Sequence, residues 1–536
     1  MCKSENFYKP KERGRNSGFL LNPPRFFDFH CAMKKFLLAL ISALPLAAVA
    51  DIDRIGGTLA PSSGNIPAIE NTGGKNYTVS AKFDLSKIAE KRVVSARLGA
   101  VCEMSGGQDT SPSITVSHMG REFDAATLLG AGKIQDTCID AGDIVNAALA
   151  RGEKSVEFKL YSKCPDGAVP KITVKHATLV AASNTDVYKL DDILTPIFSG
   201  GKIRGESVFP LGGKDGSAAR AKLLFAPRKI DAAYTYRSGE KTLLREGRDY
   251  KISGNTVEFL EGGAVETVPY SAIYADTKEA AKKNGDFFFF ENLGKYAFFA
   301  EGKWFHQRDV FFDYKHQGQS FFNLPKRGAK SLPKTMKLLK SGKPVKIVLY
   351  GDSISAGANA PFRADAAPFS PTWAKSVEKR LQKIYGKNVE LRNRALGGTT
   401  IGWGEKNIAN LVLPDKPDLV ILAFGMNDTC PPETRREKLE SMIAKVRGQN
   451  PDAEFIIVSS MRANPLWQKR MAVQDEYPKI DKSLECESVA VANVRAAHDA
   501  LLQRKRYIDM TGNNVNHPNK FLISVYAQTV LKLLEK

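Results

Sequence analysis

Residues 345–355 read Val-Lys-Ile-Val-Leu-Tyr-Gly-Asp-Ser-Ile-Ser, an apolar run followed at once by a turn-forming triplet. The run at 345–350 has the length and composition of a buried strand. Ser353 comes directly after it, and Gly351 permits a tight turn. Further apolar runs at 389–396, 418–425 and 454–461 alternate with helical patterns at 371–385, 433–447, 488–503 and 520–534. Strands that alternate with helices predict a parallel sheet covered on both faces, with its reactive groups at the carboxyl ends of the strands.

Polar or glycine-rich residues follow three of these strands. Ser353 follows the first, Gly397 and Gly398 follow the second, and Asn427 follows the third. His517 lies just before the last predicted helix. A serine beside a histidine is the usual pair for nucleophilic catalysis, and backbone or amide N–H groups are the donors that stabilise an oxyanion. Together the four segments indicate a hydrolytic serine site.

In order and residue type these segments resemble the four blocks of the SGNH (GDSL-type) hydrolases. The resemblance covers about residues 340–536 and implies a three-layer α/β/α domain that cleaves esters through an acyl-enzyme. It implies Ser353 as the nucleophile and His517 as the base. The backbone N–H groups of Ser353 and Gly398 and the amide of Asn427 would be the oxyanion donors. If the alignment with the family were shifted by one residue, Gly397 would take the place of Gly398.

One position departs from the family pattern. The family has an aspartate three residues before the histidine, where this chain has Asn514. An amide can orient an imidazole but cannot stabilise an imidazolium by charge. Three interpretations are open: a Ser–His dyad oriented by a backbone carbonyl, a carboxylate from elsewhere (Asp509 is the nearest in sequence), or a weakened enzyme. We favour the dyad because the other three blocks are intact.

The first fifty residues have the features of an export signal. Met33 opens a short positive region, an apolar stretch follows, and Ala48-Val49-Ala50 has the small side chains that signal peptidase requires. We therefore expect translation to start at Met33, cleavage after Ala50 and an exported protein, placed in the periplasm, on the cell surface or outside the cell.

Between this segment and the hydrolase domain, expected at 336–536, the chain is rich in short alternating runs separated by turn residues. Such runs predict two β-rich, sandwich-like domains, at 51–185 and 186–335. The first resembles the sandwich modules appended to polysaccharide-active enzymes. The second is similar to the N-terminal β domains that precede SGNH domains in bacterial carbohydrate esterases, and it would pack on the esterase.

Composition narrows the classes of function. The chain has 536 residues, of which 43% are hydrophobic and 25% charged, an ordinary globular balance. After the first fifty residues no apolar stretch reaches the length of a membrane span. The formal net charge is +20, but Lys and Arg are scattered, which argues against nucleic acid as a partner.

The seven cysteines show no metal-ligand spacing, and no spacing implies a metal or an organic cofactor. Cys430 and Cys486 are a plausible disulfide pair. Among Cys102, Cys138 and Cys164 the sequence does not choose a pairing.

These observations predict a secreted serine esterase that removes O-acetyl groups from a polysaccharide or glycan. Trp403 and Trp467, in the hydrolase region, are candidates to stack on a sugar, and ordinary packing is the other interpretation. Two alternatives stay open: a lipase, arylesterase or thioesterase acting on small or lipid esters, and a glycan-binding protein with a weakened hydrolase domain. The particular glycan and the oligomeric state are not defined by the sequence.

Overall fold

A computed structural model describes residues 52–535, apart from short segments at 62–67, 70, 73–74, 77, 89–94, 106–112, 120, 128–133, 164–170, 183–188, 238–239, 283–288, 293, 329 and 365. The chain separates into residues 1–48 and residues 49–536, and the second unit contains everything described below. The predicted signal segment and Cys164 lie outside the described residues. No described helix is both long enough and apolar enough to span a membrane.

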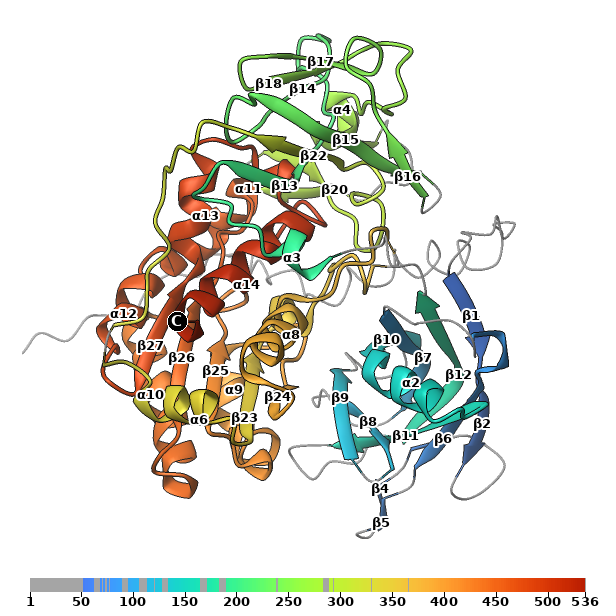
Figure 1. The fold of residues 1–536 in the computed structure, drawn as a ribbon, viewed down its shortest axis with the longest axis vertical. Helices are drawn as coiled ribbons and strands as arrows, with labels where there is room; N and C mark the ends of the chain where they lie inside the picture. Colours follow the sequence, from blue (N-terminus) through green and yellow to red (C-terminus); the bar gives the residue numbers. More distant parts are fainter. Residues whose placement is uncertain are drawn as a thin grey trace, which may run out of the picture. The chain divides into compact units, whose positions relative to one another are not determined.

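The C-terminal part is built on a five-stranded parallel sheet in the order β24-β23-β25-β26-β27 (Figure 1). Its strands are β23 (Val345–Gly351), β24 (Val389–Asn393), β25 (Leu419–Ala423), β26 (Glu454–Ser459) and β27 (Val489–Asn493). β23 and β25 are adjacent inner strands and are buried on both faces, which is why both read as nearly unbroken apolar runs.

Helices cover both faces of this sheet (Figure 1). Helices α8 (Trp373–Tyr385), α13 (Val494–Leu502) and α14 (Lys520–Leu534) share one hydrophobic core with the sheet residues Ile347, Leu349 and Ile421. Helices α9 (Ile401–Leu411) and α10 (Pro432–Gln449) pack on the opposite face, against Val348, Tyr350 and Val420. The three-layer α/β/α architecture predicted for this region is confirmed.

The helix predicted over 488–503 begins later than expected. Residues 489–493 form strand β27, and α13 starts at Val494 with the Asn493 side chain accepting a hydrogen bond from the Ala496 N–H at 2.9 Å. The run Val-Ala-Val-Ala fits both a buried strand and a helix, so the pattern alone does not locate this boundary.

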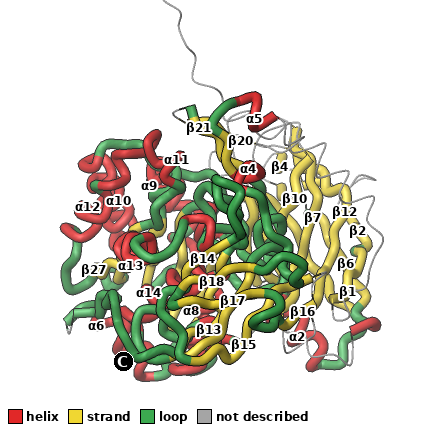
Figure 2. The backbone as a smooth tube through the Cα atoms, turned by 90° about the horizontal axis from the view of Figure 1, so that it is seen from above, coloured by secondary structure: helices red, strands yellow, loops and turns green. Residues whose placement is uncertain are grey.

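The N-terminal part is a β-sandwich. One sheet has the order β1-β12-β7-β10, with β3 also pairing with β12, and the other has the order β2-β6-β11-β8-β9. Figure 2 shows their strands, in yellow, running side by side. One core lies between them and includes Phe83, Leu98 and Phe158. The bounds are β1 (Ile52–Gly56), β2 (Thr58–Pro61), β3 (Ala68–Ile69), β6 (Val79–Asp84), β7 (Ser95–Ser105), β8 (Ser113–His118), β9 (Arg121–Thr127), β10 (Ile134–Asp140), β11 (Ser155–Lys163) and β12 (Lys171–Ala182), with helix α2 (Gly142–Ala150) between β10 and β11.

A second β-rich unit, which we call the middle unit, comprises residues 190–315. Its largest sheet has the order β13-β22-β15-β16, formed by β13 (Lys202–Val208), β22 (Val310–Lys315), β15 (Lys229–Arg237) and β16 (Glu240–Leu243). Two three-stranded sheets complete it: β14 (Arg220–Lys222), β18 (Thr256–Phe259) and β17 (Tyr250–Ser253), and β19 (Tyr274–Ala275), β21 (Lys295–Phe298) and β20 (Phe289–Asn292).

The middle unit and the C-terminal part share one hydrophobic core. Phe225, Phe312 and Tyr314 of the middle unit belong to the same buried cluster as Phe521 and Tyr526 of α14. The Lys505 ammonium also lies 2.7 Å from the Glu206 carboxylate, with both side chains fully buried. The two parts therefore fold against each other, while the predicted boundaries at 185 and 335 stay predictions.

The predicted pairing of Cys430 with Cys486 is wrong. Both are free cysteines. The Cys430 Sγ lies 3.6 Å from the Tyr477 hydroxyl, and the Cys486 Sγ lies 3.6 Å from the Ser488 hydroxyl. Their shared location in the C-terminal region did not imply that they are neighbours.

Candidate active site

Ser353 lies where the inner strand β23 ends and a short helix, α7 (Ser353–Ala356), begins. Gly351 makes this turn close to β25, because a Cβ at that position would overlap the main-chain oxygen of Ala423. The Asp352 side chain caps α7 by accepting a hydrogen bond from the Ile354 N–H at 3.1 Å. Its other oxygen accepts from the Met426 N–H at 3.2 Å, which ties the serine turn to the loop that carries Asn427.

The Asp352 carboxyl is fully buried, and burial raises its pKa to about 7. The hydrogen bonds from Ile354 and Met426 act in the opposite direction, because they stabilise the ionised form. Asp352 therefore serves the site by holding the backbone on both sides of it.

The structure brings His517 to Ser353. The Nε2 atom of His517 lies 3.0 Å from the Ser353 Oγ, and each residue is 8% exposed. His517 stands at the end of a closed loop, in which the Gly512 N–H donates to the His517 carbonyl at 2.9 Å and Thr511 pairs with Pro518. This contact is what the predicted roles of nucleophile and base require.

The two predicted oxyanion donors outside the serine turn lie on adjoining loops. The Asn427 amide donates to the Thr399 carbonyl at 3.0 Å, which places Asn427 against the turn that contains Gly398. Gly398 has a φ of 75°, a conformation that favours glycine. A Cβ built on Gly397 would lie 3.9 Å from the Ser353 Cβ, so this turn borders the serine.

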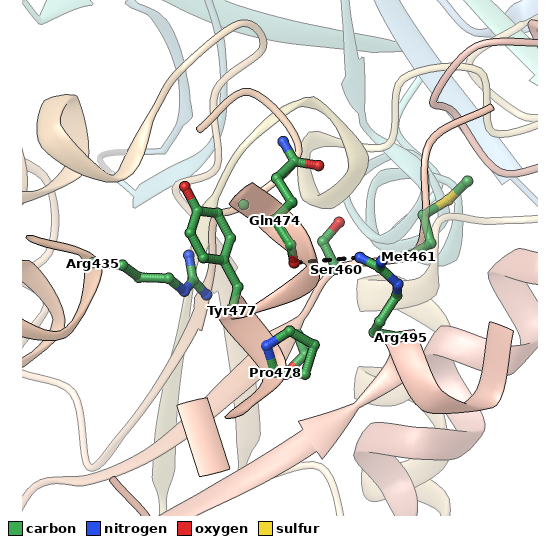
Figure 3. A pocket seen from close by; sticks show the side chains of 9 residues that line it. Arg435, Ser460, Met461, Gln474, Tyr477, Pro478 and Arg495 are labelled. Atoms are coloured by element: carbon green, nitrogen blue, oxygen red, sulfur yellow. Dashed lines mark hydrogen bonds between the residues drawn. The ribbon is translucent and has the colours of Figure 1, made fainter. Parts of the chain in front are cut away.

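A small hollow is lined by Gly425, Arg435, Gln474 and neighbouring residues (Figure 3). Gln474, which lines it, donates to the carbonyls of Met426 at 3.0 Å and Asp428 at 2.9 Å, one on each side of Asn427. Arg435, also in the lining, donates to the Phe424 carbonyl at 3.2 Å. These contacts fix the backbone that presents the Asn427 amide.

Neither predicted base-orienting residue has that role in the structure. The buried Asn514 side chain donates to the Phe298 carbonyl at 3.0 Å and accepts from the Asn464 amide at 3.2 Å. The Asp509 carboxylate accepts from the Phe209 N–H at 2.9 Å and is paired with the Arg506 guanidinium at 2.7 Å. Both residues are near His517 in the sequence, but the loop turns their side chains toward the middle unit, so neither orients the imidazole.

The carboxylate beside His517 comes from the middle unit. The Glu301 oxygens lie 3.2 and 3.3 Å from the His517 Nδ1, and the Asn513 amide donates to Glu301 at 3.1 Å. The interpretation as a dyad oriented by a backbone carbonyl is therefore wrong. Glu301 follows β21 and precedes His517 by 216 residues. The one sequence signal was indirect: Asn514 stands where the family has aspartate, which left a carboxylate from elsewhere among the interpretations.

The two predicted sugar-stacking residues pack on the core. Trp403, on α9, is half-buried, with its ring centroid 6.1 Å from that of Tyr350. Trp467, on α11 (Pro465–Gln468), is half-buried beside Val515. Contact with a sugar stays a prediction for both. Among the described residues, no group of three or more His, Cys, Asp or Glu side chains is placed to hold a metal ion.

A buried serine in contact with a histidine, at the carboxyl edge of a parallel sheet and bordered by loops with amide and backbone donors, is the arrangement of a serine hydrolase. Residues 349–520 match the model of the GDSL-like Lipase/Acylhydrolase family. This match confirms the predicted resemblance of the C-terminal region to the GDSL-type hydrolases.

Three similar proteins illustrate the relationship. An arylesterase from Vibrio mimicus is 27% identical over 140 residues, which are 25% of this chain and 64% of the relative's length. A two-domain esterase active on acetylated mannans is 20% identical, with a TM-score of 0.31, 38% of this chain covered and 52% of its own. An acetylxylan esterase from Geobacillus stearothermophilus is 17% identical, with a TM-score of 0.31, 37% of this chain covered and 96% of its own. The chain thus spans less than two thirds of the curated relative.

Proposed function

We propose that this protein is a serine esterase that hydrolyses O-acetyl esters on a polysaccharide or glycan through an acyl-enzyme intermediate. The observation that carries the esterase assignment is the 3.0 Å contact between the Ser353 Oγ and the His517 Nε2, in a domain of the GDSL-like family. That the acyl group is acetyl and that a glycan carries it are the more specific parts of the proposal.

The chemistry follows from the positions of the groups. His517 Nε2 takes the proton from the Ser353 hydroxyl as the Oγ attacks the ester carbonyl carbon. The carbonyl oxygen becomes an oxyanion, and the backbone N–H groups of Ser353 and Gly398 together with the Asn427 amide are the donors for it. When the intermediate collapses, His517 returns the proton to the departing sugar alcohol. A water molecule, activated by the same nitrogen, then releases acetate and regenerates the serine.

The organisation of the chain supports a glycan as the carrier of the ester. Two β-rich units precede the hydrolase, and the middle one contributes a carboxylate at the site itself. The predicted signal segment would place the enzyme outside the cytoplasm, where acetylated polysaccharides are found, and export remains part of the proposal.

A second candidate is an esterase of small aryl or lipid esters, which is favoured by the similarity to the arylesterase. The third sequence-based alternative, a binding protein with a weakened hydrolase domain, depended on Asn514 alone. Glu301 now supplies the carboxylate that Asn514 does not, so we do not pursue it.

The test is acetate release from acetylated xylan, acetylated mannan, mucin and peptidoglycan, with Ser353→Ala measured alongside. We expect release from one polymer and its loss in the variant. Cleavage of 4-nitrophenyl acetate without release from any polymer would leave the esterase and contradict the glycan. A preference for octanoyl over acetyl esters would favour the second candidate.

A further inference from the structure

We propose that Glu301 of the middle unit is the positioning residue that selects the reactive tautomer of His517, so that the hydrolase site is complete only with this unit in place. The inference rests on the proposed function, because it concerns how the base of that reaction is set. It assigns the role of the family's aspartate to a residue on another part of the fold.

Two groups compete for the Nδ1 atom of His517. The Glu301 carboxylate lies 3.2 Å away and can only accept a hydrogen bond, from an Nδ1–H, whereas the Asn513 amide nitrogen lies 3.0 Å away and can only donate one. The orientation of the Asn513 amide is fixed, because its oxygen already accepts three backbone N–H groups, those of residues 515, 516 and 517, each at 3.0 Å.

These two contacts favour opposite tautomers. The Asn513 amide has two hydrogens, which also face Glu301 Oε1 at 3.1 Å and Asn516 Oδ1 at 3.0 Å, so it donates to Nδ1 only by giving up one of those bonds. In that state Nδ1 is bare and the proton is on Nε2, where it faces the Ser353 Oγ. A histidine in that state cannot take the serine proton. The Glu301 carboxylate favours the proton on Nδ1, which leaves Nε2 free to act as the base. A hydrogen bond to an ionised acceptor is about twice as strong as a neutral one, so Glu301 prevails.

Glu301 is itself held by amides from the hydrolase. The Asn513 amide donates to its Oε1 at 3.1 Å. On the preceding side Asn514 holds the Phe298 carbonyl at 3.0 Å, and on the following side the Gly302 N–H donates to the Asn359 side chain at 3.0 Å. Asn359 is buried and also donates to the carbonyl of Gly512, in the histidine loop. The loops after the nucleophile and before the histidine thus both fix the segment that carries Glu301.

This arrangement explains why residue 514 is an asparagine. An aspartate there would place a carboxylate oxygen against the Phe298 carbonyl, 3.0 Å from the present amide nitrogen, on the side of the loop that faces the middle unit. The asparagine at the family's aspartate position is therefore matched to a carboxylate supplied from residue 301.

The first experiment is Glu301→Gln in the full-length protein, with 4-nitrophenyl acetate hydrolysis and fluorophosphonate labelling of Ser353 as readouts. We expect kcat and the labelling rate to fall by about 10⁴, the size of the loss when a triad aspartate becomes asparagine and the wrong tautomer prevails. We expect KM to change by less than about threefold, because Glu301 does not touch the substrate. A variant that keeps kcat within threefold of the wild type overturns the proposal.

The second experiment supplies the carboxylate for His517 from position 513 instead of position 301. In the Glu301→Gln background, Asn513→Asp places a carboxylate oxygen where the amide nitrogen now lies, 3.0 Å from Nδ1. We expect kcat to recover at least tenfold. Asn514→Asp in the same background is the matched control and is expected to give no recovery, because that side chain faces Phe298.

Comparing the two double variants cancels any general loss of folded protein. Equal activity of the two, or recovery from position 514 alone, overturns the proposal. Failure of the proposed function is a separate result: the wild-type protein would then neither cleave the acetyl ester nor react with the fluorophosphonate.

Discussion

The side chain of Asn514 donates a hydrogen bond to the main-chain oxygen of Phe298 at 3.0 Å, in a fully buried environment. This contact turns the residue three positions before His517 away from the imidazole and toward the middle unit. It links the histidine loop to the end of β21, from which the chain continues to Glu301.

Replacing this amide by a carboxylate should harm the protein. We expect Asn514→Asp to lower the free energy of unfolding by about 1–3 kcal/mol, because a buried acceptor would lose its donor and face another oxygen. Activity should fall as the Glu301 segment loosens. Urea unfolding and kcat for an acetyl ester measure both effects.

Asn516→Asp is the control for that variant. It makes the same change two residues away but keeps the oxygen that accepts from the Asn513 amide at 3.0 Å. We expect it to cost less than about 1 kcal/mol. A rise in activity of tenfold or more in Asn514→Asp would contradict this interpretation of the loop.

The sequence predicts the hydrolase fold well because its signals are local. Buried parallel strands give apolar runs, helices give their own period, and Ser353, Gly398, Asn427 and His517 stand at the ends of these elements. Glu301 has no such signal. It lies in a loop of a different unit, and only the packing of the middle unit on α14 and the histidine loop brings it to Nδ1.

Asn427 provides a prediction about the oxyanion. Its amide is held by the Thr399 carbonyl at 3.0 Å and its backbone by Gln474 on both sides, so one amide hydrogen is available in a fixed direction. We expect Asn427→Ala to lower kcat by about 10²–10³ with KM little changed, the cost of removing one such donor. Steady-state kinetics with an acetyl ester measure it, and a loss of less than fivefold would exclude Asn427 from the oxyanion hole.

The buried pair of Lys505 and Glu206 provides a prediction about stability. The Glu206 carboxylate accepts from the Lys505 ammonium of the hydrolase at 2.7 Å, across the boundary between the two parts, and from the Tyr314 hydroxyl of the middle unit at 2.6 Å. Lys505→Met leaves that carboxylate buried without its cation, so we expect a loss of about 3–5 kcal/mol in the free energy of unfolding.

The double variant Lys505→Met with Glu206→Gln should lose less than the single one, because no charge is then buried alone. Urea unfolding of the wild type, both single variants and the double variant completes the cycle. Strictly additive losses would show that the two side chains do not interact.

His306 provides a prediction about the stability of the fold at acidic pH. Its Nε2–H donates to the Asn359 carbonyl at 2.8 Å, the ring is 2% exposed, and burial lowers its pKa to about 4. In the unfolded chain a histidine has a pKa of about 6.5, so between these values the unfolded state binds the proton and the folded state does not. The contribution of neutral His306 to the free energy of unfolding is therefore fully present above about pH 6.5. It is lost as the pH falls toward 4, by about 3 kcal/mol in total.

His306→Gln keeps a donor for Asn359 but does not titrate. We expect its free energy of unfolding to fall less steeply than that of the wild type between pH 6.5 and 4, as measured by urea unfolding at several pH values. Some slope should remain, because burial also lowers the pKa of His498, to about 3. Wild type and variant with identical slopes would show that His306 is protonated without opening the fold.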